Sequence, residues 1–190
     1  MRILMPLATL VALAAPAGAT PPVPRKAPEL TITEPSGAQT LLSSYKGKVV
    51  VIEFLHTTCP HCQRASQVFT RLHKELGPRG FQPIGIAFNE GVDPVIVNNF
   101  VRQFGADYPI GISPRETVES YLGISVMTRY VVPQIVVIDR KGMIRAQSDP
   151  GGTESLQDEN SLRNLIDALL KEGATTSNTK KPAPAHRKTS

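Results

Sequence analysis

Cys59 and Cys62 are the residues of this sequence whose spacing points most clearly to chemistry. They are its 2 cysteines, and the spacing lets both thiols lie within one turn of a helix. A structural disulfide between them would stabilise little, because closing so short a loop removes little entropy from the unfolded chain. A structural zinc site normally uses further nitrogen or sulfur ligands, and the sequence has no second cysteine pair. The spacing therefore favours reversible exchange between a dithiol and a disulfide.

The segments around this pair are predicted to form a strand followed by a helix. The run 48–55 (KVVVIEFL) is β-branched and apolar nearly throughout, as in a central strand covered on both faces. The segment 60–76 has one apolar helical face and is stopped by Gly77 and Pro78. The apolar positions of that face are Ala65, Val68, Phe69, Leu72 and Leu76. The cysteine motif therefore lies at the junction, with Cys59 at the N-terminus of the helix.

A thiol at a helix N-terminus is activated by its position. Unpaired backbone N–H groups and the positive end of the helix dipole stabilise the thiolate, which is the species that reacts in disulfide exchange. Pro60 fits the first turn, where its missing N–H is not needed. We therefore expect Cys59 to be the nucleophile and Cys62, facing inward, to be the resolving thiol. Protonated His61 is expected to stabilise the thiolate further, although a solvated histidine on the helix surface fits the sequence equally well.

Glu53 stands in the middle of the apolar run 48–55, where an acid is rarely buried without a partner or a task. We expect it to take and return the proton of Cys62 while a mixed disulfide is resolved, with its pKa raised by burial. The alternative is that Glu53 pairs with a lysine or points outward at a sheet edge. The central character of the strand favours the first interpretation.

The rest of the body alternates strands and helices. A hairpin is expected over 30–33 and 39–42. Further strands are predicted at 82–88, 108–112, 133–139 and 143–148, and further helices between Asp93 and Gly105, at 116–122, and over a last segment with Leu162, Leu165, Ile166, Leu169 and Leu170 on one side. His73 is expected on the solvated surface, and the loop 139–142 is expected to be a hairpin turn. This order predicts an α/β fold with a mixed central sheet flanked by helices.

The two ends of the chain differ from the body. Residues 1–19 have a cation at Arg2, an apolar stretch over 3–15 and a small-residue cleavage site at 17–19, which predicts a signal peptide. The alternative is an uncleaved membrane anchor, but the apolar stretch is shorter than the roughly 20 residues that span a bilayer. We therefore expect cleavage after Ala19, export, a periplasmic or extracytoplasmic location and no stable membrane span after cleavage. A Pro-rich leader (20–28) and a basic tail (173–190) are both expected to be disordered, which leaves one folded domain over 29–172.

The positive charge of the chain is concentrated near its ends. The formal net charge is +5, but five of the 21 Lys and Arg residues lie in the first and last segments. The rest of the chain, leader and body together, therefore has 16 cations against all 16 Asp and Glu residues of the sequence. We expect no basic face for phosphates and no nucleic-acid partner.

Two runs of this sequence resemble the TlpA/ResA branch of the thioredoxin superfamily, which has a redoxin (AhpC/TSA-type) domain. They are LTITEPSGAQTLLSSYKGKVVVIEFLHTTCPHC and VPQIVVIDRKGMI, and the resemblance covers nearly the whole body. It implies a thioredoxin-like fold with an N-terminal hairpin and with a strand-helix insertion after the active-site helix, which the segment 82–123 matches. It also implies that Cys59 and Cys62 are the redox pair, that Glu53 is the buried acid and that Pro133 is a cis-proline packed against the site.

The resemblance further implies how such a protein works. The Cys59–Cys62 disulfide itself is the redox group, without a separate cofactor. The implied partners are proteins that present thiols or disulfides, and a redox protein that recycles the pair. The lack of a dimerisation domain predicts a monomer.

The sequence departs from that branch around the motif. Branch members usually have a tryptophan shortly before the first cysteine, whereas this chain has no Trp and places the run 55–58 (LHTT) there. Pro60, His61 and Val132 resemble the oxidase DsbA more than the reductants of the branch. The reduction potential of DsbA is about −120 mV and that of thioredoxin about −270 mV. Since the family resemblance suggests a reductant and the Pro60-His61 dipeptide suggests an oxidant, the sequence leaves the direction of electron flow open.

Two other functions compete with thiol–disulfide exchange. Thr57 and Thr58 suit a redoxin-type thiol peroxidase, but the proline expected upstream of the reactive cysteine is missing. A Cu(I)-handling protein would use both thiolates and a late histidine, and the late histidine of this sequence is His186, in the predicted tail. Both remain alternatives to the oxidoreductase.

Overall fold

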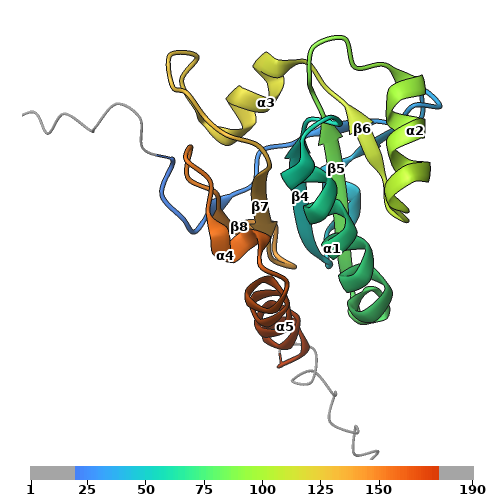
Figure 1. Ribbon diagram of the computed structural model, residues 1–190. Helices are drawn as coiled ribbons and strands as arrows, with labels where there is room; N and C mark the ends of the chain where they lie inside the picture. The colour runs from blue at the N-terminus through green and yellow to red at the C-terminus, as the bar shows by residue number, and fades with distance from the viewer. Residues whose placement is uncertain (1–19, 176–190) are drawn as a thin grey trace, which may run out of the picture.

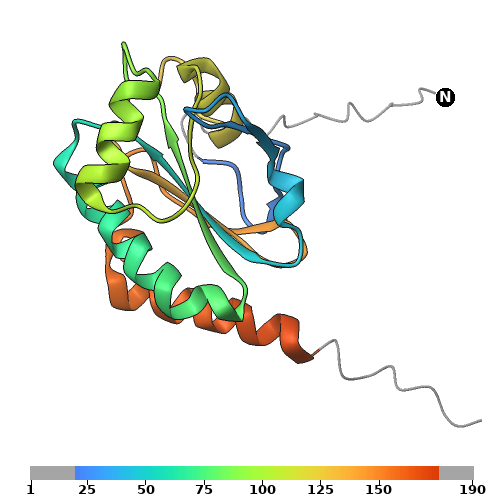
Figure 2. The same cartoon turned by 90° about the vertical axis from the view of Figure 1, so that its right-hand side faces the viewer.

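The computed structural model describes residues 20–175, and within this range an eight-stranded mixed sheet has helices on both faces (Figures 1 and 2). The strands are β1 (Arg25–Lys26), β2 (Thr31–Thr33), β3 (Gln39–Leu41), β4 (Val49–Leu55), β5 (Phe81–Ala87), β6 (Ile110–Ile112), β7 (Gln134–Ile138) and β8 (Met143–Gln147). The helices are α1 (Pro60–Leu76), α2 (Pro94–Phe104), α3 (Arg115–Leu122), α4 (Glu154–Gln157) and α5 (Glu159–Thr175), with 3-10 turns η1 (Leu42–Tyr45) and η2 (Gly77–Arg79). The strand order is β1-β8-β7-β4-β5-β6-β2-β3.

The strand and helix that carry the cysteine motif agree with the sequence prediction. β4 is buried along its whole length, parallel to β5 on one side and antiparallel to β7 on the other. α1 begins and ends at the predicted residues. The other predicted strands and the helix at 116–122 are present with ends that differ by one or two residues, and α2 lies between Asp93 and Gly105 as expected. The predicted α/β fold with a mixed sheet is therefore confirmed.

The N-terminal hairpin and the insertion meet at one end of the sheet. β2 pairs with β3 in the hairpin and also with β6, where Thr33 lies opposite Ile112. The approach is close at Gly111, because a Cβ there would lie 2.9 Å from Cγ2 of Ile32. The two features that the resemblance implied thus form one continuous extension of the sheet.

Alternate residues of β4 point into different layers, as the pleat requires. One core lies under α1, α2 and α5, and the other lies under α3 and the hairpin. The first contains Val49, Val51 and Leu55, and the second contains Val50, Ile52 and Phe54. Figure 2 shows α1 and α5 running side by side over the first core. Glu53 has the parity of the first set, so its side chain points toward α1.

The expectation that residues 20–28 are disordered is wrong. Arg25 and Lys26 form β1, which pairs with β8 at the edge of the sheet. The guanidinium of Arg25 also donates to Oε1 of Gln147 at 2.6 Å. Backbone hydrogen bonds hold this segment in the sheet. Such bonds do not require a periodic pattern of apolar side chains, so the sequence gives no sign of them. The folded domain therefore begins before residue 29.

The predicted terminal segments lie largely outside the described residues. The expected signal peptide, 1–19, and the part of the expected tail from residue 176 onward fall there. The start of that tail is part of α5, which continues to Thr175. Between residues 20 and 175 no helix combines the length and the apolar character that crossing a membrane requires.

The charges of the body are not spread evenly in space. A hollow of about 330 Å³ near the start of β4 is lined by Lys26, Lys46, Lys48 and Lys141. Two acids in the same lining accept backbone N–H groups, Glu29 from Ser43 and Asp139 from Lys141. Four lysines and two acids thus meet at this hollow, a grouping that a count of charges along the sequence does not show, and the absence of a basic face for phosphates stays a prediction.

Candidate active site

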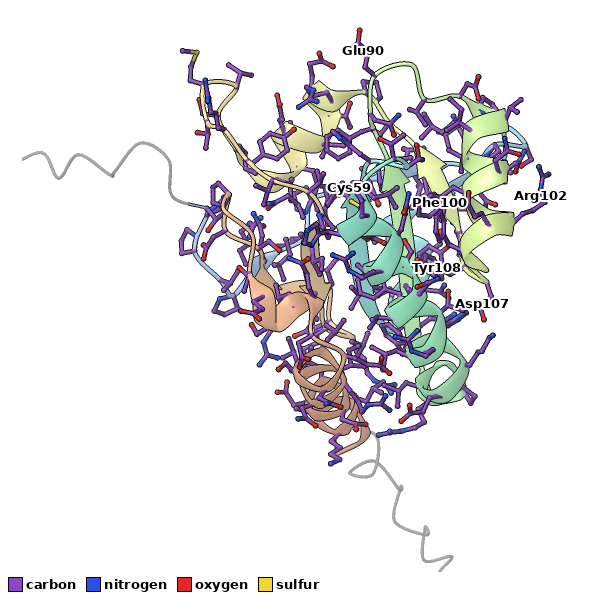
Figure 3. The ribbon with its side chains drawn as sticks, viewed as in Figure 1. Cys59, Glu90, Phe100, Arg102, Asp107 and Tyr108 are labelled. Atoms are coloured by element: carbon purple, nitrogen blue, oxygen red, sulfur yellow. The ribbon has the colours of Figure 1, made fainter. Side chains whose placement is uncertain are left out.

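Cys59 is the N-cap residue of α1, with Pro60 in the first turn as predicted. Figure 3 shows its side chain at the beginning of the helix. The residue is partly exposed, and its Sγ donates to the carbonyl oxygen of Val132 at 3.6 Å. Both cysteines are free thiols in this structure. The thiol of Cys59 is therefore open to an incoming sulfur and lies beside the chain segment that precedes β7.

Cys62 lies one turn further along α1 and is fully buried. Burial raises the pKa of its thiol strongly, and the nearby charge of Glu53 raises it further. A thiol in this environment keeps its proton until a base removes it. The contrast between an open first thiol and a buried, protonated second thiol is the arrangement that a nucleophile and a resolving thiol require.

Glu53 is buried between the neighbouring strands, opposite Gly85 on β5 and Ile135 on β7. Its Oε2 accepts a hydrogen bond of 2.7 Å from Oγ of Ser66, and its Oε1 has no hydrogen-bond partner among residues 20–175. Burial raises the pKa of this carboxyl to about 8, and the Ser66 hydrogen bond lowers it in part. The alternative of a lysine pair or a sheet edge is therefore wrong, while the proton-transfer role stays a prediction.

A polar cluster that the sequence did not reveal is built on Ser66, the residue that donates to this carboxyl. The carbonyl of Ser66 accepts from Oγ1 of Thr70 at 3.0 Å and from the hydroxyl of Tyr108 at 3.4 Å. Burial raises the pKa of Tyr108 well above its usual value, and the charge of Glu53 contributes. Figure 3 shows Tyr108 beside α1, close to Asp107. Ser66 could have been found from sequence, because it is one turn after Cys62 and interrupts the apolar face of the helix.

Pro133 follows a cis peptide bond to Val132, as the resemblance implied. Gln134, which is fully buried, donates from Nε2 to the carbonyls of Val131 at 2.8 Å and Asp149 at 3.2 Å. The N–H of Val131 donates to the carbonyl of Pro150 at 2.9 Å. These bonds fix the Val132 carbonyl that faces Cys59, and no sequence pattern indicated Gln134 for this task.

The segment before Cys59, where related proteins usually carry tryptophan, is held by polar contacts. Oδ1 of Asn89 accepts from both the N–H and Oγ1 of Thr57, at 3.0 and 3.2 Å. Nε2 of Gln63 donates to the carbonyl of Thr57 at 3.0 Å. The ring of His56 packs edge-on against Phe88 with centroids 4.6 Å apart, and burial lowers the pKa of His56. The loop is thus positioned without an indole ring.

The other histidines and the loop at Asp139 were also assigned from sequence. His61 is exposed, with Nδ1 3.0 Å from Nη2 of Arg64, and its effect on the thiolate stays a prediction. His73 lies at the surface as expected, with its side chain 24% exposed, but it is paired there, since Nδ1 lies 3.1 Å from Oδ1 of Asp107. The hairpin turn at 139–142 is confirmed, since Oδ1 of Asp139 accepts from the N–H of Lys141.

A metal site would need several ligands around the cysteines. In the part of the chain from 20 to 175, no three His, Cys, Asp or Glu side chains lie together in a way that could hold a metal ion. His186, the histidine that the Cu(I) alternative required, lies outside the described residues.

Comparison with known proteins agrees with this geometry. The model of the AhpC/TSA family matches residues 23–147. The chain belongs to the AhpC/TSA family. It is 25% identical over 123 residues to the thiol-disulfide oxidoreductase ResA of Bacillus thuringiensis (strain Al Hakam), a match that covers 65% of this chain and 67% of that protein. A ResA of Geobacillus thermodenitrificans is 25% identical over 119 residues, which cover 63% of this chain and 64% of the relative.

Solved structures share the fold of this AhpC/TSA domain. A thiol:disulfide interchange protein of the thioredoxin family from Chlorobium tepidum superposes with a TM-score of 0.65 at 24% identity, over 79% of this chain and 99% of the other. A secreted Mycobacterium tuberculosis disulfide oxidoreductase homologous to E. coli DsbE gives a TM-score of 0.58 at 18% identity, over 74% and 96% of the two chains. The thioredoxin-like fold and the redoxin family that the sequence indicated are therefore confirmed.

Proposed function

We propose that this protein is a thiol:disulfide oxidoreductase that acts on protein substrates outside the cytoplasm, with the Cys59–Cys62 disulfide as its redox group and no further cofactor. One observation carries the proposal. A partly exposed Cys59 caps α1. One turn further on lies a buried Cys62, whose pKa is raised by burial and by the charge of Glu53, a carboxyl whose own pKa burial raises to about 8. Relatives of the chain that are named thiol-disulfide oxidoreductases support it.

Reduction of a substrate would proceed in two exchanges. The Cys59 thiolate attacks one sulfur of the substrate disulfide, so that a Cys59–substrate disulfide forms and the other substrate sulfur leaves as a thiolate. Cys62 then gives its proton to Glu53 and attacks Sγ of Cys59, which forms the Cys59–Cys62 bond and releases the second substrate thiolate. Two electrons pass from the pair to the substrate. Oxidation of a substrate dithiol is the same sequence reversed.

Glu53 suits the proton transfer in both directions. With a pKa of about 8, about a tenth of the carboxyl is ionised at pH 7, which leaves a base available without holding a full charge in the core. Because the pKa of Glu53 is close to neutral pH, the carboxyl can accept the Cys62 proton when the pair is oxidised and return it when the pair is reduced.

The redox potential of the pair decides the proposal. The mature protein is equilibrated with glutathione buffers of known ratio, and the dithiol fraction is quantified by alkylation, with Cys59→Ser as the control. A reduction potential of about −270 mV makes the protein a reductant, and one of about −120 mV makes it a disulfide donor. A pair that never cycles contradicts thiol exchange. A peroxide-consumption assay on the same sample separates exchange from the thiol peroxidase alternative.

Export, the monomeric state and the recycling partner are further parts of the proposal. We expect cleavage after Ala19, so that the mature chain begins six residues before Lys26 of β1. Cell fractionation with N-terminal sequencing tests this, and a cytoplasmic, uncleaved protein would contradict it. Trapping with Cys62→Ser identifies both the substrates and the protein that recycles the pair.

A further inference from the structure

Exposed apolar side chains gather in the segment that leads from α3 to cis-Pro133. Met127 is 88% exposed, Val126 is 79% exposed and Val131 is 49% exposed, which places three of the seven large exposed apolar residues of the range 20–175 within six positions. We call Val126, Met127 and Val131 the apolar tip. Exposed apolar side chains that are grouped along one segment are typical of a place where another molecule is bound.

The apolar tip is held outward from a fixed base. Thr128 donates to the carbonyl of Ser125 at 2.8 Å, which makes a turn with Val126 and Met127 at its corner. Further along, the hydroxyl of Tyr130 donates to Oε1 of Glu119 at 3.1 Å, and its ring stacks against Phe88 with centroids 6.4 Å apart. Figure 1 shows this segment, between α3 and β7, extending beyond the sheet at the end where α1 begins. Its exposure is therefore part of the fold.

The apolar tip belongs to the same chain segment as the carbonyl that contacts the reactive thiol. Val131 directly precedes Val132, whose carbonyl oxygen lies 3.6 Å from Sγ of Cys59. Any sulfur bonded to Cys59 must therefore lie beside Val132, and the residues that flank it pass near Val131. Met127 is five residues from Val132, so at most about 17 Å of extended chain separates them. A substrate segment of about five residues is long enough to reach both.

A second group of exposed apolar side chains lies at the same end of the sheet. Val95 is 65% exposed and Ile96 is 36% exposed in the first turn of α2. Figure 3 places Glu90, in the connection from β5 to α2, at the same end of the molecule as Cys59. Exposed apolar side chains therefore occur on more than one element at this end of the molecule.

We propose that the apolar tip docks the polypeptide segment that carries the substrate cysteine, and that it selects segments with large apolar side chains next to that cysteine. This inference rests on the proposed thiol exchange. Methionine is flexible and polarizable, so it adapts to side chains of different shapes. The substrate class is therefore polypeptide with apolar residues exposed around cysteine, as in chains that have not finished folding.

The test compares two substrates on matched variants. The oxidised protein is mixed in separate reactions with three thiols. Two are single-cysteine peptides, one with leucine and one with serine on both sides of the cysteine, and the third is glutathione. The peptide thiolate attacks Sγ of Cys59, the Cys59–Cys62 bond breaks, and the mixed disulfide and the free Cys62 thiol are quantified by acid quench and mass spectrometry. The variants are Val126→Ser/Met127→Ser and, as a matched control on the distant β3, Leu41→Ser, which removes an apolar residue that is 47% exposed.

The expected result is specific to the apolar peptide. The double variant reacts about tenfold more slowly with the leucine peptide, which corresponds to an activation free energy higher by about 1.4 kcal/mol. It reacts with the serine peptide and with glutathione at the wild-type rate. Leu41→Ser leaves all three rates unchanged. Equal rates of wild type and double variant with the leucine peptide overturn the inference. A wild-type dimer that is lost in the double variant also overturns it, because a second copy of the chain would then cover the apolar tip. A wild-type protein that fails to react even with glutathione overturns the proposed function itself.

Discussion

The two faces of β4 use the same strand for different purposes. Toward α3 its side chains are all apolar, and Ile52 and Phe54 are completely buried there. Toward α1 the apolar series is interrupted by Glu53, which is equally buried but whose carboxyl accepts only one hydrogen bond among residues 20–175, from Ser66. The first face stabilises the fold, whereas the second gives up stability to hold a carboxyl beside Cys62. The comparison shows that a shift of one residue along a strand is enough to separate packing from chemistry.

The largest effect should come from removing the resolving thiol on the α1 side. Cys62→Ser is expected to abolish turnover and to accumulate mixed disulfides at Cys59, because no second sulfur can attack the bond. Non-reducing electrophoresis and mass spectrometry measure the adducts. The double variant Cys59→Ser/Cys62→Ser is the control and should form none. Turnover of Cys62→Ser at the wild-type rate would show that another group resolves the intermediate.

A large effect of a different kind is expected on the α3 side. Phe54→Ala should lower the free energy of unfolding by about 3–5 kcal/mol, because it leaves a cavity in a fully buried site. Urea unfolding measures the loss. The folded fraction should still react with glutathione at close to the wild-type rate, since Phe54 points away from Cys62. A comparable loss of reactivity per folded molecule would mean that the two faces are not separate.

The pH dependence of stability tests the cost of Glu53. Its carboxyl is ionised in the unfolded chain above about pH 4.3, but the folded protein keeps it protonated up to about pH 8. Between these values the folded state binds the extra proton, so this group makes the stability of the reduced protein fall as pH rises, by up to about 1.4 kcal/mol per unit. Glu53→Gln should remove this slope in urea unfolding at pH 5, 6, 7 and 8. Parallel slopes for variant and wild type would contradict the raised pKa.

The smallest effect is expected at Ser66. Ser66→Ala removes the hydrogen bond that lowers the pKa of Glu53, so that pKa should rise by about one unit. Titration of the carboxyl by infrared or carbon-13 spectroscopy measures the shift, and Thr70→Val serves as a control because Thr70 contacts the backbone of Ser66 without touching Glu53. An unchanged or lowered pKa in Ser66→Ala would rule out Ser66 as the group that tunes this acid.

Sequence reasoning found what depends on local pattern. The apolar run of β4 and the helical stripe of α1 predicted both elements, and an acid within that run predicted the burial of Glu53. Contacts between distant segments were out of reach: the Tyr108 hydroxyl meets Ser66 across 42 residues, and Gln134 holds Asp149 across 15. β1 was missed because backbone pairing with β8 holds it in place. The cis bond at Pro133 came from family resemblance, since nothing local distinguishes it.

The pairing of β1 with β8 also sets an order in time. Arg25 lies opposite Ile144, so β1, which is synthesised first, cannot pair until β8, the last strand, has been made. The cysteine motif is made between them, well before Val132 and Gln134, which complete its surroundings. A nascent chain therefore carries both thiols before it has the environment that controls them, and during that interval their reactivity is that of ordinary cysteines.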